Sequence, residues 1–144
     1  MKYALLVLAL AACNPYLTQQ SVAPPGRTAR LDPVNGFWGL KRYRLELSEG
    51  VALAVTCNQG APCEHTNVIS DDPAIAEVRP ASLAALEPVG LDSTAPSSAF
   101  VVVGKAPGTT RLHVKTKDGK RDVVVTVIAP PGPPNLQTAA ASHP

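Results

Sequence analysis

Three cysteines, Cys13, Cys57 and Cys63, are the side chains of this sequence with the best-defined chemistry. An odd number leaves one thiol without a partner in an oxidising compartment. Cys57 and Cys63 enclose a Gly and a Pro, so the chain can reverse there, and a disulfide would stabilise the fold by about 2–2.5 kcal/mol. A metal site is the competing interpretation, but two thiols and His65 would still need a fourth ligand. Thioredoxin-type chemistry needs two residues between the cysteines, whereas five stand here.

The first cysteine follows a segment with the features of a secretory signal. Met1-Lys2 supplies a positive charge, and the apolar run that follows is much shorter than the roughly 20 residues of a membrane-spanning helix. We therefore expect a signal peptide over residues 1–12. Leu10-Ala11-Ala12-Cys13 resembles the lipobox of bacterial lipoproteins. The resemblance implies diacylglycerol transfer to the Cys13 sulfur, cleavage before this residue and acylation of the new amino terminus. The alternative is an ordinary signal peptide cut after an alanine, with Cys13 as a stray thiol.

Acylation of Cys13 would leave Cys57 and Cys63 as an even set, which favours a structural disulfide between them. Two or three acyl chains anchor a protein stably, since each buried CH₂ contributes about 0.8 kcal/mol. The lipid would thus attach the protein to a membrane of the bacterial cell envelope. Asn14 is not the Asp that retains lipoproteins at the inner membrane of enteric bacteria. This favours the outer membrane, at its periplasmic face or at the cell surface.

The other polar residues favour neither catalysis nor a metal site. Asp71 and Asp72 are adjacent carboxylates, as in calcium sites, but they precede a proline in a turn, where Asp commonly caps backbone amides. We expect the histidines to be solvated or in the tail: His65, His113 and His143. No serine lies in a Gly-x-Ser-x-Gly motif, and no glycine-rich phosphate loop is present. We therefore expect no catalytic residue and no cofactor, and a carbohydrate-active enzyme is the least favoured alternative.

One short basic cluster is present, formed by Lys41, Arg42 and Arg44. On an outward face it would contact anionic lipid headgroups, or it would simply be a solvated face beside Glu46. The formal net charge of +2 gives no reason to expect nucleic acid as a partner.

The stretch from Ala99 to Ile128 predicts three β-strands with their turns. A β-branched run, 100–103, ends at a glycine, and residues 111–115 alternate between polar and apolar. An Asp-Gly pair at 118–119 then predicts a hairpin, followed by a strand that places Val123, Val125 and Val127 on one face. We expect these three strands to form a β-meander.

The first half of the chain predicts further strands of the same kind. Residues 42–47 alternate, with Tyr43, Leu45 and Leu47 on the buried face, and a Ser-Glu-Gly turn follows. Residues 51–57 alternate again, with apolar side chains at the odd positions. Short strands are expected at 66–69 and 74–78, separated by a turn at 70–73.

Part of this pattern resembles the bacterial Ig-like domains of group 2. Residues 70–78, Ser-Asp-Asp-Pro-Ala-Ile-Ala-Glu-Val, are similar to the family's Ser-x-Asp-Pro-x-x-Ala-x-Val signature, and residues 104–114 and 123–127 are similar to its Pro-Gly-Thr turn and closing strands. The resemblance covers about residues 40–129 and implies an all-β fold, an antiparallel Ig-like β-sandwich of about seven strands. Residues 79–98 form a longer segment than the family pattern has at this point and contain prolines, so we expect an extra edge strand or a helical turn there. This insertion is also where a function specific to this protein could lie.

The remaining segments lack periodicity. Residues 13–35 are polar and proline-rich and predict a lipidated cysteine followed by a flexible tether. Phe37 and Trp38 start the folded part, 36–129, and more often close one end of a core than bind a partner. The Pro- and Ala-rich end, 130–144, predicts a disordered tail or a peptide that docks on a partner.

Together these features predict a lipid-anchored, non-enzymatic display module of the cell envelope. The Ig-like domain would bind protein or polysaccharide in a structural or adhesive role. The alternative is an accessory subunit of a larger envelope, secretion or surface-filament assembly, docked through a sheet edge or through the tail.

Overall fold

A computed structural model describes residues 14–36, 41–59, 61–81, 98–117 and 119–130. These residues form nine β-strands, and none of them is helical. The strands are β1 (Tyr16–Gln19), β2 (Ala29–Asn35), β3 (Lys41–Ser48), β4 (Ala52–Asn58), β5 (Asn67–Ser70), β6 (Ala76–Ala81), β7 (Ala99–Gly104), β8 (Gly108–Lys115) and β9 (Lys120–Ile128). No helix within the described residues is long and apolar enough to cross a membrane.

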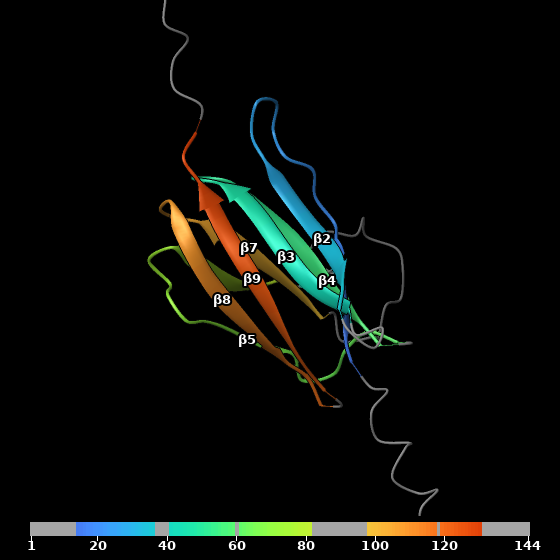
Figure 1. Cartoon of the computed structure of the whole chain (residues 1–144). Helices are drawn as coiled ribbons and strands as arrows, with labels where there is room; N and C mark the ends of the chain where they lie inside the picture. Colours follow the sequence, from blue (N-terminus) through green and yellow to red (C-terminus); the bar gives the residue numbers. More distant parts are fainter. Residues whose placement is uncertain (1–13, 37–40, 60, 82–97, 118, 131–144) are drawn as a thin grey trace, which may run out of the picture.

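The strands form two sheets that pack face to face as a sandwich (Figure 1). One sheet has the order β1-β4-β7-β6 and the other β2-β3-β9-β8-β5. In an Ig-like fold, the first, second, fifth and fourth strands share one sheet and the third, sixth and seventh share the other. Strands β1, β4, β7 and β6 and strands β5, β8 and β9 follow this order, so the predicted Ig-like sandwich is confirmed. The hairpin β2–β3 is added beside β9.

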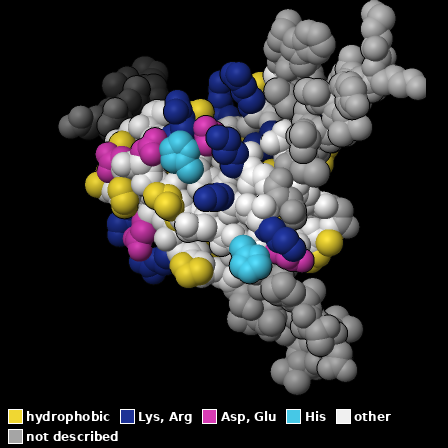
Figure 2. All heavy atoms as spheres, turned by 90° about the horizontal axis from the view of Figure 1, so that it is seen from below, with side chains coloured by type: hydrophobic (Ala, Val, Ile, Leu, Met, Phe, Trp, Pro, Cys, Tyr) yellow, Lys and Arg dark blue, Asp and Glu magenta, His cyan; other side chains and the backbone are white. Residues whose placement is uncertain are grey.

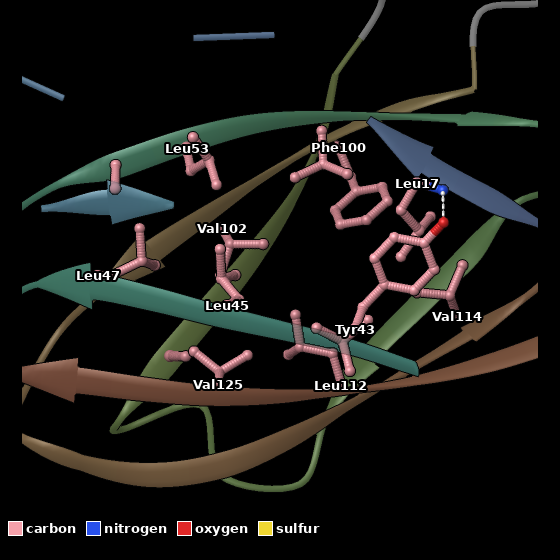
Figure 3. Close-up of a cluster of buried hydrophobic side chains, with 14 of the residues drawn as sticks. Leu17, Tyr43, Leu45, Leu47, Leu53, Phe100, Val102, Leu112, Val114 and Val125 are labelled. Atoms are coloured by element: carbon pink, nitrogen blue, oxygen red, sulfur yellow. Dashed lines mark hydrogen bonds between the residues drawn. The ribbon is translucent and has the colours of Figure 1, made fainter. Parts of the chain in front are cut away.

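The core lies between the sheets and is built from the alternating apolar positions (Figure 3). Leu45, Leu47, Leu53 and Val125 are at most 1% exposed. The faces that were predicted to be buried on β3, β4, β8 and β9 are buried. Because full burial of a Leu or Val side chain stabilises a fold by about 1.5–3 kcal/mol, this alternation is sufficient to drive the sheets together.

The predicted hairpin is confirmed, but the predicted meander is wrong. β8 and β9 pair antiparallel around a Thr116–Gly119 turn. β7 instead joins the other sheet, between β4 and β6. The chain crosses between sheets at residues 105–107, where the Lys105 and Ala106 amides donate to the Ile75 carbonyl. Gly108, which follows the crossing, has a φ of 155°, a backbone conformation that residues with a side chain rarely adopt, and a Cβ there would also lie 2.9 Å from Ile75 Cδ1.

The expected tether over residues 13–35 is also wrong for the part that the structure describes. β1 pairs with β4 and β2 pairs with β3, so the folded part begins near Asn14 and contains nine strands rather than seven. Tertiary contacts hold these short strands: Leu17 is 6% exposed and Ala29 is 7% exposed. The Thr28 and Ser48 backbones are also linked, because the Ser48 amide donates to Thr28 O and the Thr28 amide donates to Ser48 Oγ.

One sheet is not wholly antiparallel, contrary to the expectation. β3 and β9 run parallel, with Leu45 opposite Val125, whereas the other described pairings are antiparallel. A parallel neighbour needs a long crossover. Here most of the chain lies between β3 and β9, so no local pattern indicates this pairing.

Several predicted features lie outside the described residues. These are the signal peptide, Cys13, Phe37 and Trp38, most of the 79–98 insertion, and the tail beyond Pro130. β6 extends through Ala81, so the start of the insertion continues a strand.

Candidate functional site: a basic surface around the start of the first strand

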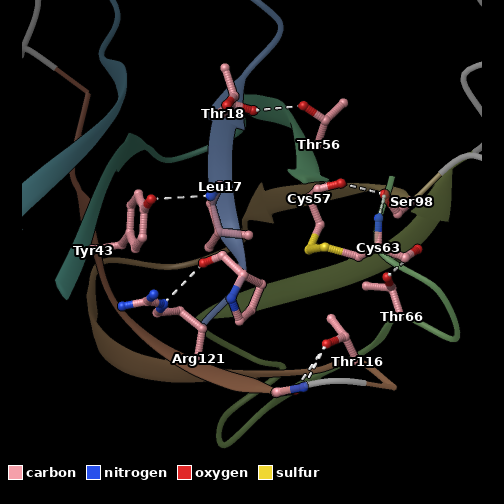
Figure 4. The surroundings of a disulfide bond; sticks show 12 residues. Leu17, Thr18, Tyr43, Thr56, Cys57, Cys63, Thr66, Ser98, Thr116 and Arg121 are labelled. Carbon is pink, nitrogen blue, oxygen red and sulfur yellow. Dashed lines mark hydrogen bonds between the residues drawn. A yellow bond between two sulfur atoms is a disulfide. The ribbon is translucent and has the colours of Figure 1, made fainter. Parts of the chain in front are cut away.

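Arg121 fixes the beginning of the described chain to the sandwich (Figure 4). Its Nε donates to the Pro15 carbonyl at 3.1 Å, and its Nη1 donates to the Lys41 carbonyl. Its guanidinium lies 5.4 Å from the centroid of the Tyr43 ring. The side chain is 9% exposed, and a buried guanidinium requires such acceptors.

The Tyr43 hydroxyl also holds the beginning of the described chain, because it accepts a hydrogen bond from the Leu17 amide at 3.2 Å (Figure 3). Leu17 is itself buried in the core. Residues Pro15 to Leu17 are therefore bound by β3, β4 and β9 together. The first described residue, Asn14, directly precedes this fixed segment.

Asn14 lines a shallow depression of about 430 Å³ at this end of the molecule. Four exposed cations also line it, and we call them the basic patch: Lys41, Arg42, Arg111 and Lys120. Lys41 and Arg42 come from β3, Arg111 from β8, and Lys120 from the start of β9. Figure 2 views the molecule from the end at which β1 begins and shows several Lys and Arg side chains on this face.

Two further cations flank the basic patch in the strand register. Arg44 lies beside Val124, which is opposite Arg111, and Lys115 lies opposite Lys120. A second depression of about 770 Å³ shares Lys120 and the carboxylate of Asp122 with the first and is also lined by Lys115 and Lys117. The cationic surface therefore continues around the β8–β9 hairpin.

The cations of this surface are largely free of carboxylate partners. Within the described residues, the four patch residues, Arg44 and Lys115 take part in no ion pair, whereas Lys117 pairs with Glu64 at 2.9 Å. Elsewhere Arg30 pairs with Asp32, and Glu77 pairs with both Arg79 and Lys105. A group of unpaired cations on one face attracts anions more strongly than the small net charge indicates.

His113 lies on the polar face of β8, where its side chain is 44% exposed, and two carboxylates hold its ring. Its Nδ1 lies 2.8 Å from Asp122 Oδ1 and its Nε2 lies 2.9 Å from Asp71 Oδ1. A neutral imidazole has one N–H, so only the protonated ring donates to both carboxylates. The bonds to Asp122 and then to Asp71 raise the pKa of His113 above its ordinary value of 6.5.

The His113 cluster predicts a specific pH dependence of stability. The raised pKa belongs to the folded state, so the stabilisation is complete below pH 6.5 and is lost as the pH rises through the raised value. We expect the difference in unfolding free energy between wild type and His113→Gln to shrink as the pH rises from 6.5 through the raised pKa of His113. Urea titrations at each pH measure this difference. A difference that stays constant with pH contradicts the assignment, and NMR titration should show that Asp122→Asn lowers the His113 midpoint more than Asp71→Asn.

No described group of three or more His, Cys, Asp or Glu side chains is arranged to hold a metal ion. The two nitrogens of His113 each face a different carboxylate, which does not leave a ring nitrogen for a shared ion. Asp72 caps the following turn, because its Oδ1 accepts from the Ala74 amide at 2.9 Å. The capping interpretation is thus confirmed for Asp72, whereas the Asp71 carboxylate is bonded to His113.

Comparisons with known proteins give a similarity to surface-layer proteins. No family model matches the sequence, and no curated protein matches it. Domains 4 and 5 of the S-layer protein SbsC share 22% identity over 81% of this chain and 54% of that chain, at a TM-score of 0.40. Domains 5–6 of the same protein share 23% identity over 83% of this chain and 47% of that chain, at 0.41. The chain spans about half the length of these structures.

The disulfide between Cys57 and Cys63 is confirmed (Figure 4). Their Cα atoms lie 5.4 Å apart, and both residues are at most 4% exposed. Ser98 ties the loop to β7: the Cys63 amide donates to Ser98 Oγ at 3.0 Å, and this hydroxyl donates to the Cys57 carbonyl at 2.5 Å. His65, two residues after Cys63, is exposed.

Loss of this disulfide should destabilise the fold measurably. The double variant Cys57→Ala/Cys63→Ala is expected to lose about 2–2.5 kcal/mol of unfolding free energy, because the unfolded chain is no longer closed into a short loop. Urea denaturation with and without a reductant measures the effect. The reductant should destabilise the wild type and leave the double variant unchanged. Equal sensitivity of both proteins to the reductant would contradict the prediction.

The structure brings some predicted site residues together and adds others. Lys41 and Arg42 lie in the basic patch and Arg44 lies beside it, as a cluster of neighbours in sequence should. Arg111 and Lys120 were not predicted, because their proximity to β3 depends on the β3–β9 pairing. The only available signal was their position on the polar faces of two adjacent strands.

Proposed function

We propose that this chain is a lipid-anchored, non-enzymatic module of the bacterial cell envelope, placed at the outer membrane. The observation that carries the proposal is Leu10-Ala11-Ala12-Cys13 behind a cationic and apolar leader. The Cys57–Cys63 disulfide supports export, because disulfides persist in oxidising compartments. Kinship with the group 2 bacterial Ig-like domains is part of the same proposal and is supported by the motif at 70–78 and by the sheet order.

The arrangement of the chain ends supports a display role. The described chain begins at one end of the sandwich and leaves β9 at the opposite end (Figure 1). An anchor at Cys13 would therefore direct the β3–β4 turn and the loops after β5 and β7 away from the membrane. Loops presented by a rigid sandwich are common binding surfaces. We assign contact with a protein or polysaccharide partner to these loops.

The sheet edges give less support to docking by strand addition. The edge strands β1 and β5 have four residues each, and the edge strands β2 and β6 contain Pro33 and Pro80. Short edges and edge prolines hinder pairing with another strand. An accessory subunit docked through a sheet edge is therefore the less favoured function.

Acylation of Cys13 can be tested in cells with an alkyne-labelled fatty acid. Wild-type protein should incorporate the label, fractionate with membranes and enter the detergent phase, whereas Cys13→Ala should lose the label. Thr18→Ala, an exposed position on β1, is the matched control and should behave as wild type. Globomycin should make the wild-type precursor accumulate. Unlabelled, soluble wild-type protein would reject the proposal.

A further inference from the structure

We propose that the basic patch docks on anionic headgroups of the bilayer that holds the lipid anchor, so that the domain lies against the membrane. This inference rests on the proposed function, because it takes Cys13 as the anchored residue. It adds a second binding site, made of Lys41, Arg42, Arg111 and Lys120, and names the occupant as an anionic phospholipid surface.

The basic patch lies next to the residue that would carry the lipid. Asn14 lines the depression that the basic patch surrounds, and Cys13 is covalently bonded to Asn14. Consecutive Cα atoms are about 3.8 Å apart, so a lipid on Cys13 brings the bilayer surface to the patch. Tyr16 is 52% exposed beside it, with Lys41 Nζ 5.0 Å from its ring centroid. An exposed tyrosine next to a cation is typical of a membrane interface.

The chain between the lipid and the fold is too short to let the domain move away from the bilayer. Arg121 and Tyr43 hold the Pro15 carbonyl and the Leu17 amide, so the fold begins immediately after the anchor. A flexible tether over residues 14–35 would have let the domain move away from the headgroups. A short connection instead keeps the local concentration of headgroups at the patch high, so that weak individual contacts suffice.

The face around the anchor carries more positive than negative charge. The unpaired cations of the basic patch, with Arg44 and Lys115 beside them, share their depression with one carboxylate, Asp122. Asp122 is bonded to His113 at 2.8 Å, and Asp71 and Asp72 lie next to Arg111 at the edge of the patch. The remaining excess of cations is attracted by an anionic membrane, which turns this face of the domain toward the headgroups.

The test uses acylated protein reconstituted into phosphatidylcholine vesicles with or without phosphatidylglycerol. An amine-reactive probe read by mass spectrometry should modify Lys41 and Lys120 several-fold more slowly in the anionic vesicles, and high salt should restore the rates. Lys105, at the opposite end, is the internal control and should react equally in both. Equal rates at Lys41, Lys120 and Lys105 in both vesicle types would overturn the proposal.

A second measurement separates docking from anchoring. The unacylated chain from Asn14 onward should float with phosphatidylglycerol vesicles, and Lys41→Gln/Lys120→Gln should weaken this binding by roughly thirtyfold. Arg27→Gln/Lys105→Gln, a matched loss of two exposed cations away from the patch, should leave it unchanged. Equal binding by both double variants overturns docking. If the native protein carries no acyl chains, the lipid anchor at Cys13 is rejected. Docking of the basic patch on anionic lipid is still tested separately by the flotation of the unacylated chain.

Discussion

Removal of β1 is expected to lower the free energy of unfolding by about 3–5 kcal/mol. The variant is the soluble chain that starts at Ser21 instead of Asn14. It loses the burial of Leu17, the hydrogen bonds of Arg121 to Pro15 and of Leu17 to Tyr43, and the pairing with β4. Urea denaturation followed by circular dichroism measures the change. Because small domains are stable by only about 5–15 kcal/mol, this loss should lower the urea concentration at the unfolding midpoint clearly.

Two point variants give this truncation a matched control. Leu17→Ala removes a side chain that is 6% exposed and should cost about 2–4 kcal/mol, whereas Val22→Ala changes one that is 90% exposed and should cost nothing measurable. A truncated chain that unfolds at the wild-type urea concentration would show that residues 14–20 are the tether that their composition indicates.

Leu47→Ala should destabilise the centre of the sandwich by about 3–4 kcal/mol. Leu47 is 0% exposed and lies between Ala29 on β2 and Val127 on β9. A cavity at this point removes contacts with both neighbouring strands and cannot close without moving them. Thermal and urea denaturation measure the loss.

Ile69→Ala is the control for Leu47→Ala, because Ile69 is 57% exposed on the edge strand β5. It should change the unfolding free energy by less than about 0.5 kcal/mol. Comparable losses for the two variants would mean that the alternation of exposed and buried residues does not mark the core.

Strands that bury one face could be predicted from sequence alone. The alternation at Tyr43, Leu45 and Leu47 reflects a side-chain period of two and one solvated face, and a single segment carries this information. β1 was not predicted because its stability comes from partners far along the chain. β2 was not predicted because its sequence is polar and contains a proline, although its partner β3 is the next strand. Leu17 depends on β3 and β4, and a four-residue strand shows too little alternation to detect.

The arrangement of strands was less predictable than their existence. A hairpin has a local signal in its turn, which is why the β8–β9 pair was found. The turn after Gly104 gave no indication that the chain crosses to the other sheet there. The contacts that fix this crossing, from Lys105 and Gly108 to Ile75, come from a loop about thirty residues earlier.

The candidate site was predictable to the same partial degree. Lys41, Arg42 and Arg44 form a visible cluster, but the addition of Arg111 and Lys120 depends on the parallel pairing of β3 with β9. His113 reads as a solvated histidine because its two carboxylates come from a different strand and a distant turn. Local polarity therefore predicted which residues are outward, and the fold decided which of them meet.

An intact-mass measurement of the protein purified from the membranes of its native cells tests the central claim most directly. We expect a mature chain that begins at Cys13 and is heavier than its polypeptide by a diacylglyceryl group, with or without a further acyl chain on the amino terminus. A chain of unmodified mass recovered in the soluble fraction would contradict it.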